Sequence, residues 1–189
     1  MTRAGRPTRT TPEAWVQAAL DTIEESGVAG LAVEPVARRL GVSKGGFYHH
    51  FADRRALLRA ALGLWEERFV VAQSARFEAI PDPRERLRSL LRLAIVELQP
   101  TVITKLMAAD EDPDVAAALE RATVRRLAML ERAFADLGLP AARARTRARL
   151  AYSAYLGMAQ LARRPAAGLT DAGEAEAFLA ELEALLQVD

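Results

Sequence analysis

The chain has 189 residues, 51% of them apolar, so it can bury a sizeable core as one compact unit or as a small domain on a larger one. It has no cysteine, which excludes disulfides, cysteine-based zinc sites and thiol catalysis. No apolar run approaches the roughly 18 residues of a membrane span, and the Arg- and Thr-rich start lacks the apolar centre of a signal peptide. We therefore expect a cytoplasmic protein without a membrane partner.

The formal net charge of +1 is unevenly distributed. Residues 1–55 are slightly basic, and the remainder is slightly acidic. Within the first part, the acids concentrate in the first expected helix, whereas the bases lie in the N-terminal tail and between Arg38 and Arg55. This distribution indicates where a negatively charged partner would bind.

Proline and glycine divide the chain into about nine expected helices. The first begins with a strong start signal, in which Thr11 can cap the helix, Pro12 fits its first position and Glu13 lies near its positive end. No segment alternates with the two-residue period of a strand, so the fold class is all-α. The later expected helices begin near Glu34, Ser43, Asp53, Pro83, Thr101, Asp112, Pro140 and Thr170.

The second and third expected helices have the pattern of a helix-turn-helix. Such a motif needs a small residue where the helices cross and a glycine with positive φ in the turn. Ala37 and Gly41 fill these two positions. Apolar residues occupy the remaining slots, namely Val36, Leu40, Val42 and Phe47. The alternative is an ordinary helical hairpin.

The third expected helix presents polar groups suited to phosphate. Its outward positions are Ser43, Lys44, Gly45, Tyr48 and His49. Gly45 is followed by Gly46, and each costs a helix about 1 kcal/mol relative to alanine. The missing side chains would let the backbone approach DNA closely, although plain turn flexibility is an alternative reading.

A metal site at the adjacent histidines is not expected. His49 and His50 would point about 100° apart on a helix, and no third ligand is near them in the sequence. We expect no metal and no cofactor.

The segment GVSKGGFYHHFADR, residues 41–54, resembles the signature of the TetR family of bacterial regulators. The resemblance implies a three-helix DNA-binding head in residues 1–55 and a helical-bundle regulatory domain in residues 56–189. It also implies that double-stranded DNA is the partner and that a set of residues in and after the third helix binds it: Ser43, Lys44, Gly45, Gly46, Tyr48, His49 and Arg54.

Two positions depart from the family pattern. Ala32 stands where the family usually has Thr or Ser, and Glu34 stands where an arginine is common. Glu34 would repel phosphates unless it pairs with a base or points away. A tail bearing Arg3, Arg6 and Arg9 either compensates by contacting DNA or has no role.

A two-helix DNA-binding motif does not need a body of this size. The family resemblance implies that the regulatory domain binds a small-molecule effector, and its apolar residues could line the pocket. The alternative is that the same residues simply form core. Few polar candidates lie among them, so a largely apolar effector is expected. The candidates are Trp65, Phe69, Ile103, Met107, Leu130, Phe134, Tyr152 and Tyr155.

The last two expected helices have more apolar surface than one intramolecular contact needs. Two such pairs would form a four-helix bundle across a twofold axis, which predicts a homodimer and a palindromic operator. The candidate interface residues are Ala154, Met158, Leu161, Phe178, Leu182 and Leu185.

The predicted function is a DNA-binding transcriptional regulator, specifically a repressor that a small apolar effector releases from its operator. The alternative is a DNA-binding regulator or architectural protein without an effector. An all-α enzyme is disfavoured, because both histidines lie in the segment expected to face DNA and no pair of carboxylates lies in an apolar setting.

Overall fold

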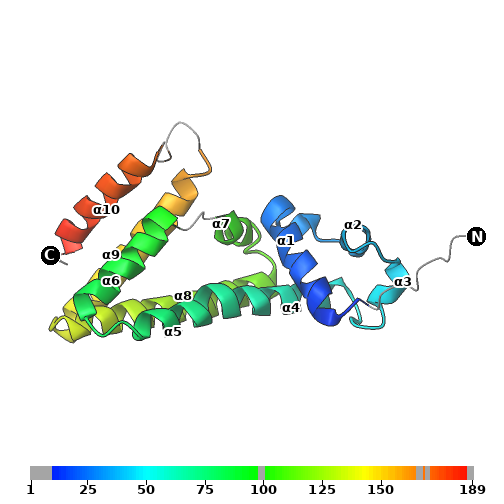
Figure 1. Cartoon of the computed structure of the whole chain (residues 1–189), viewed down its shortest axis with the longest axis horizontal. Coiled ribbons are helices and arrows are strands. Elements are labelled where there is room, and N and C mark those ends of the chain that lie inside the picture. Colours follow the sequence, from blue (N-terminus) through cyan, green and yellow to red (C-terminus); the bar gives the residue numbers. More distant parts are fainter. Residues whose placement is uncertain (1–9, 98–100, 165–167, 169–170, 187–189) are drawn as a thin grey trace, which may run out of the picture. The chain divides into compact units, whose positions relative to one another are not determined.

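The computed structural model describes residues 10–97, 101–164, 168 and 171–186. Every regular element in these residues is a helix, which confirms the all-α prediction (Figure 1). Because α4, η1 and α5 follow one another without a break, as do α6 and η2, the described residues form nine continuous helices. The elements are α1 (Pro12–Gly30), α2 (Val33–Arg39), α3 (Lys44–Phe47), α4 (Arg54–Glu66), η1 (Glu67–Val71), α5 (Ala72–Glu78), α6 (Pro83–Arg92), η2 (Leu93–Glu97), α7 (Thr101–Met107), α8 (Pro113–Asp136), α9 (Ala141–Leu161) and α10 (Ala172–Leu186).

The helices pack into two compact units. The first comprises Met1–Glu67 and Lys105–Leu119, and the second comprises Arg68–Thr104 and Glu120–Asp189. The helix α8 therefore contributes residues to both units. The predicted boundary after residue 55 separates a DNA-binding domain from a regulatory domain by function and not by packing. It stays a prediction.

In the first unit, side-chain caps mark the positions where α1 and α4 begin. The Thr11 hydroxyl accepts a hydrogen bond from the Ala14 N–H, and Asp53 accepts one from the Ala56 N–H at 2.7 Å. Each bond satisfies a backbone donor that the first turn of a helix leaves unpaired. The same signals were read from the sequence, so these two helix starts are confirmed.

The core of the first unit lies between α1 and α4. Trp15 and Ile23 of α1 are fully buried, as are Leu57 and Leu58 of α4. Gly27, with a φ of +75°, interrupts the helical backbone of α1 before its last turn. A side chain rarely adopts this conformation, which explains the glycine at this position.

Aspartates also cap two helices of the second unit, α6 and α10. The Asp82 carboxylate accepts bonds from the N–H groups of Arg84 and Glu85 at the start of α6. At the start of α10 the cap is Asp171, which accepts a bond from the Glu174 N–H at 3.0 Å. Thr170, the cap expected from the sequence, lies outside the described residues, as does Pro100.

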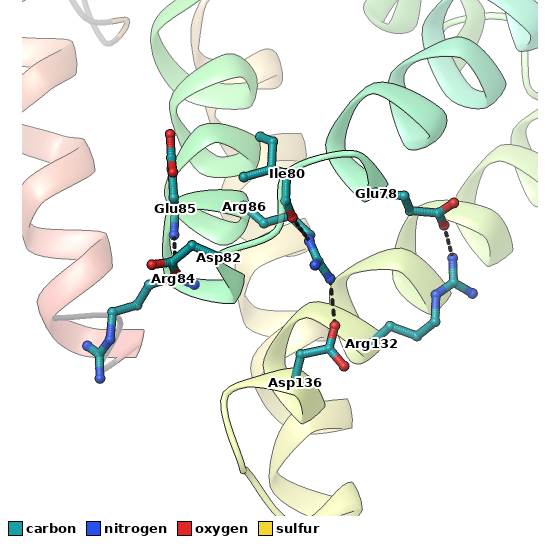
Figure 2. A network of polar contacts seen from close by, with 8 residues as sticks. All are labelled: Glu78, Ile80, Asp82, Arg84, Glu85, Arg86, Arg132 and Asp136. Carbon is teal, nitrogen blue, oxygen red and sulfur yellow. Dashed lines mark hydrogen bonds and ion pairs between the residues drawn. The ribbon is translucent and has the colours of Figure 1, made fainter.

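A polar network fastens the turn between α5 and α6 to α8 (Figure 2). Arg86 donates to the Ile80 carbonyl at 3.0 Å and to the Asp136 carboxylate at 2.6 Å. Nearby, Arg132 of α8 donates to Glu78 at 2.8 Å. These bonds join three helices of the second unit, α5, α6 and α8.

Two segments of the second unit are π-helical, namely η1 and η2. A π-turn is wider than an α-turn and is uncommon outside functional sites. Here η1 directly continues α4, and η2 directly continues α6.

Within the described residues, no helix combines the length and apolar content that crossing a membrane requires.

Candidate DNA-binding site and effector cavity

The turn between α2 and α3 has the geometry that its residues predict. Gly41 adopts a φ of +66°, and the Val42 N–H donates to the Ala37 carbonyl at 3.0 Å. Ala37 is almost completely buried where the two helices meet, so a larger side chain there would separate them. The helix-turn-helix is therefore formed by the residues that the sequence pattern assigned to it.

Phe47 anchors α3 to the rest of the first unit. Its ring is fully buried and meets the Trp15 ring edge-on, with 5.5 Å between their centroids. On its other side it stacks on Phe51 at 5.7 Å, while His50 is exposed. The helix α3 ends at Phe47, and the Phe51 ring packs against it. A short helix held by one buried ring leaves its outer residues available to a partner.

Of the residues predicted to bind DNA, those within residues 43–49 gather on this outer edge. Ser43, Lys44, Gly45 and His49 are exposed, and the Tyr48 side chain is 58% exposed although its ring also touches Phe47. Gly46 is half-buried. An exposed aromatic ring beside an exposed lysine is a suitable surface for a phosphate backbone.

Packing within the chain does not explain the two glycines of α3. A methyl group added at Gly46 would meet no atom within 4 Å, and one at Gly45 would meet only the Ser43 hydroxyl at 3.7 Å. Neither residue has a positive φ, in contrast to Gly41. Open space in front of both residues agrees with a surface that a partner's backbone approaches closely.

Glu34 is paired. Its carboxylate accepts a hydrogen bond from the Lys44 ammonium at 2.9 Å, and both side chains are exposed. This hydrogen bond lowers the pKa of Glu34 and raises the pKa of Lys44, so both remain charged at neutral pH. Of the two possibilities considered for Glu34, pairing with a base is the one observed.

Arg54 lies away from the exposed edge. Its half-buried guanidinium donates to the backbone carbonyls of Leu31 and Val28, at 2.6 and 2.7 Å. These carbonyls belong to the end of α1, so Arg54 ties the start of α4 to that end. A DNA contact for Arg54 stays a prediction, and the observed contacts give it a positioning role.

Arg39 of α2 is also paired within the chain. Arg39 forms a two-point pair with Glu25 at 2.7 and 2.8 Å. The tail with Arg3, Arg6 and Arg9 lies outside the described residues.

Among the residues that the structure describes, no three His, Asp or Glu side chains gather as a metal ion would require.

The second unit contains an apolar cavity of about 60 Å³. It is small for a drug-sized ligand, since typical ligand pockets span roughly 300–1,000 Å³, but it exceeds the ~15 Å³ that one water molecule requires. Residues from α5, α6, η2, α8 and α9 line it, namely Gln73, Phe77, Leu90, Leu91, Leu93, Ala94, Arg126, Met129, Leu130, Ala151, Tyr152 and Tyr155.

Three of the eight predicted effector residues line this cavity: Leu130, Tyr152 and Tyr155. Trp65 and Met107 belong to the first unit, where Trp65 is core. The remaining three, Phe69, Ile103 and Phe134, belong to the second unit but lie outside the lining. The lining also contains Arg126, which was not among the predicted residues, although a charged residue seven positions after Leu119 and four before Leu130 stands out on an apolar helix face.

The predicted dimer residues divide by exposure. Leu185 of α10 is 77% exposed and Leu161 of α9 is 40% exposed, whereas Leu182 is buried within its own protomer. Ala154, Met158 and Phe178 are half-buried. Leu150, which is also exposed, extends the α9 residues into a stripe at positions 150, 154, 158 and 161.

The exposed edge lies in the part of the chain for which known proteins give the clearest match. Residues 16–61 match the family model described as "Bacterial regulatory proteins, tetR family". Through these residues the chain is similar to the TetR family. The family consists of DNA-binding transcriptional regulators, so the resemblance seen in residues 41–54 is confirmed.

Two curated relatives support the TetR assignment. The HTH-type transcriptional regulator BetI 1 of Chromohalobacter salexigens is 35% identical over 78 residues, which are 40% of this chain and 38% of BetI 1. The class A tetracycline repressor protein from transposon 1721 of Escherichia coli is 45% identical over 53 residues, which are 28% of this chain and 24% of the repressor. The matched part of this chain thus spans well under half the length of these relatives.

Solved structures extend the likeness in fold to nearly the whole chain. A transcriptional regulator from Rhodococcus sp. Rha1 superposes with a TM-score of 0.78 at 24% identity, over 94% of this chain and 96% of that one. A TetR transcription regulator from Haloarcula marismortui superposes with a TM-score of 0.76 at 21% identity, over 93% of this chain and 96% of that one. At these identities the likeness concerns the fold.

Proposed function

We propose that this protein is a repressor that binds a palindromic operator through residues 43–49 and leaves it when a small effector occupies the second unit. The observation that carries the DNA-binding part is the exposed edge of α3, where Lys44 and Tyr48 flank two glycines that packing does not require. Lysine and a phenolic hydroxyl donate to phosphate oxygens, and absent side chains admit the DNA backbone.

Two-point engagement of an operator requires a homodimer. The exposed apolar groups of α9 and α10, Leu150, Leu161 and Leu185, support such an interface, because large apolar side chains at the surface are stabilised when a second copy covers them. A twofold dimer presents its two α3 helices to half-sites about one helical turn apart, which makes the operator palindromic. We assign the protein to the cytoplasm, where chromosomal DNA lies.

The experiment that tests DNA binding begins with selection of operators from a random duplex library. Lys44→Ala and Tyr48→Phe should each weaken binding to the selected duplex by about five- to thirtyfold, the range for a hydrogen bond to a charged group. Lys105→Ala is the matched control, because Lys44 and Lys105 are the two lysines of the chain. Unchanged affinity in both variants would exclude α3 from the interface.

The apolar cavity supports the effector part of the proposal. Ligands found by a thermal-shift screen should lower operator affinity, and by linkage the operator should lower ligand affinity by the same factor. A ligand that binds the second unit without changing operator affinity would favour the alternative of a regulator without an effector.

A further inference from the structure

The walls of the cavity in the second unit are apolar except at a few points. Leu90, Leu91 and Leu130 are among the apolar residues of the lining, and Arg126 of α8 brings a charged group to it. A guanidinium at an apolar cavity is costly to desolvate unless polar partners offset the cost.

Arg126 is held in place by two contacts. Its guanidinium lies over the Tyr155 ring, 5.5 Å from the ring centroid, and donates to the Phe69 carbonyl at 3.1 Å. The side chain is half-buried, so part of it is removed from water. A guanidinium carries five N–H donors in a planar fork, which matches the two oxygens of a carboxylate.

We propose that the ligand of this cavity is a small amphipathic acid, with its carboxylate on Arg126 and its apolar chain against Leu90, Leu91 and Leu130. This inference rests on the proposed function, because it assumes that the cavity is the effector site. The acid class follows from the charge of the one cation in the lining, since an amine would be repelled and an alcohol would form weaker bonds.

The two tyrosines of the lining suit the same ligand. Burial raises the pKa of Tyr155 although the Arg126 charge opposes it, so the Tyr155 phenol stays protonated at neutral pH and can donate to an acid. Tyr152 exchanges a hydrogen bond with Thr123 at 3.1 Å.

Arg126 also connects the cavity to the long helix that begins at Arg54. The Phe69 carbonyl that it binds belongs to η1, the π-helical segment that directly continues α4. On the cavity wall itself, Leu93 and Ala94 belong to the other π-segment, η2. An acid that shares the Arg126 donors changes a contact on η1, which gives the ligand a means of acting on that helix.

The test uses octanoate, 1-octanol and octylamine as probes of equal chain length. Binding to the full-length protein is measured by isothermal titration calorimetry and by thermal shift. Octanoate should bind at least about tenfold more tightly than 1-octanol, as expected for a charge-assisted bond, and octylamine should bind most weakly. Equal affinity for octanoate and 1-octanol in the wild-type protein would overturn the proposal without any variant.

Variants then locate the acid. Arg126→Met should remove the preference for octanoate while keeping 1-octanol binding, and Arg126→Lys should retain part of the preference. Arg125→Met, at the exposed neighbour on α8, is the matched control and should bind like the wild type. A preference that survives in Arg126→Met would place the acid elsewhere and overturn the assignment.

Operator affinity measured with octanoate separates this inference from the proposed function. Arg126-dependent octanoate binding that leaves operator affinity unchanged would support the acid site and contradict effector release. Operator release by 1-octanol, with no gain for octanoate, would support effector release and contradict the acid site.

Discussion

The Lys44 ammonium lies 2.9 Å from the Glu34 carboxylate, across the turn that joins α2 to α3. The pair places an acid beside the lysine proposed to bind phosphate. The hydrogen bond lowers the pKa of Glu34, so the carboxylate stays ionised near neutral pH. We therefore expect it to compete with phosphate for Lys44 and to moderate DNA affinity.

Glu34→Gln should accordingly strengthen operator binding. The substitution removes a negative charge from the interface and frees Lys44, and we expect a gain of about two- to tenfold at low salt, given the modest strength of exposed ion pairs. Fluorescence anisotropy titrations at several salt concentrations measure it. Glu24→Gln, on the exposed part of α1, serves as a control. A loss of affinity in Glu34→Gln would mean that the acid helps to position Lys44.

Gly46→Ala should separate DNA binding from folding. The added methyl meets no atom of the chain within 4 Å, so the head should be as stable as the wild type or more stable by up to about 1 kcal/mol. On the operator the methyl would occupy the space of the DNA backbone, and affinity should fall. Gly41→Ala is the contrasting variant, because its φ of +66° should make the alanine destabilising. Thermal unfolding measures the stability of both variants, and gel shift measures their operator affinity. Full affinity in Gly46→Ala would contradict a close approach of the DNA backbone to this residue.

Leu185→Arg should yield a folded monomer. The side chain is 77% exposed in the protomer, so the change costs little within one chain but places a charge in the proposed interface. Leu182 is a poorer probe, because it is buried and an arginine there would disturb the protomer itself. Val124→Arg, at an exposed apolar residue of α8, is the matched control. Light scattering should show a dimer for the control and a monomer for Leu185→Arg, and a dimeric Leu185→Arg would place the interface elsewhere.

Asp114→Asn should change how stability depends on pH. The Arg55 guanidinium donates to the Asp114 carboxylate at 2.5 Å and lowers its pKa. A carboxyl group whose pKa is lowered by folding stabilises the protein at pH values above its unfolded-state pKa of about 3.9. This contribution is lost as pH falls through the lower folded-state pKa. The wild type should therefore melt slightly higher than Asp114→Asn at pH 7, by about 1–3 °C for an exposed pair. The difference between the two melting temperatures should shrink as pH falls below the ordinary pKa of an aspartate, and a constant difference would exclude this cause.

Local rules account for the features that the sequence predicted well. Gly41 and Ala37 are required by the turn itself, and Asp53 caps α4 because a carboxylate satisfies the first backbone donors of any helix. The Glu34–Lys44 pair spans ten residues and a turn, so helical spacing rules could not predict it. Tertiary packing decided that Trp65 is core of the first unit and that Arg126 reaches the cavity. Periodicity identifies a buried face, but it does not distinguish the core of one unit from the cavity lining of another.

Arg54 provides the sharpest distinction between a DNA contact and a positioning role. The family resemblance implies a phosphate contact, whereas the guanidinium donates to the Leu31 and Val28 carbonyls at 2.6 and 2.7 Å. Arg54→Lys keeps the charge but lacks the planar fork that reaches both carbonyls, so it should lower the melting temperature of the protein. If Arg54 acts by positioning, operator affinity should fall in parallel while the slope of log affinity against log salt stays the same.

A direct contact predicts a different result for Arg54→Met. Loss of one phosphate contact should reduce the magnitude of the salt slope by about 0.9, because one fewer counterion is released on binding. We expect the slope of Arg54→Met to match the wild type, and the slope of Lys44→Ala, the reference for a lost phosphate contact, to decrease. Equal decreases in the two variants would show that Arg54 leaves the carbonyls of α1 to bind DNA, and the positioning role would then be wrong.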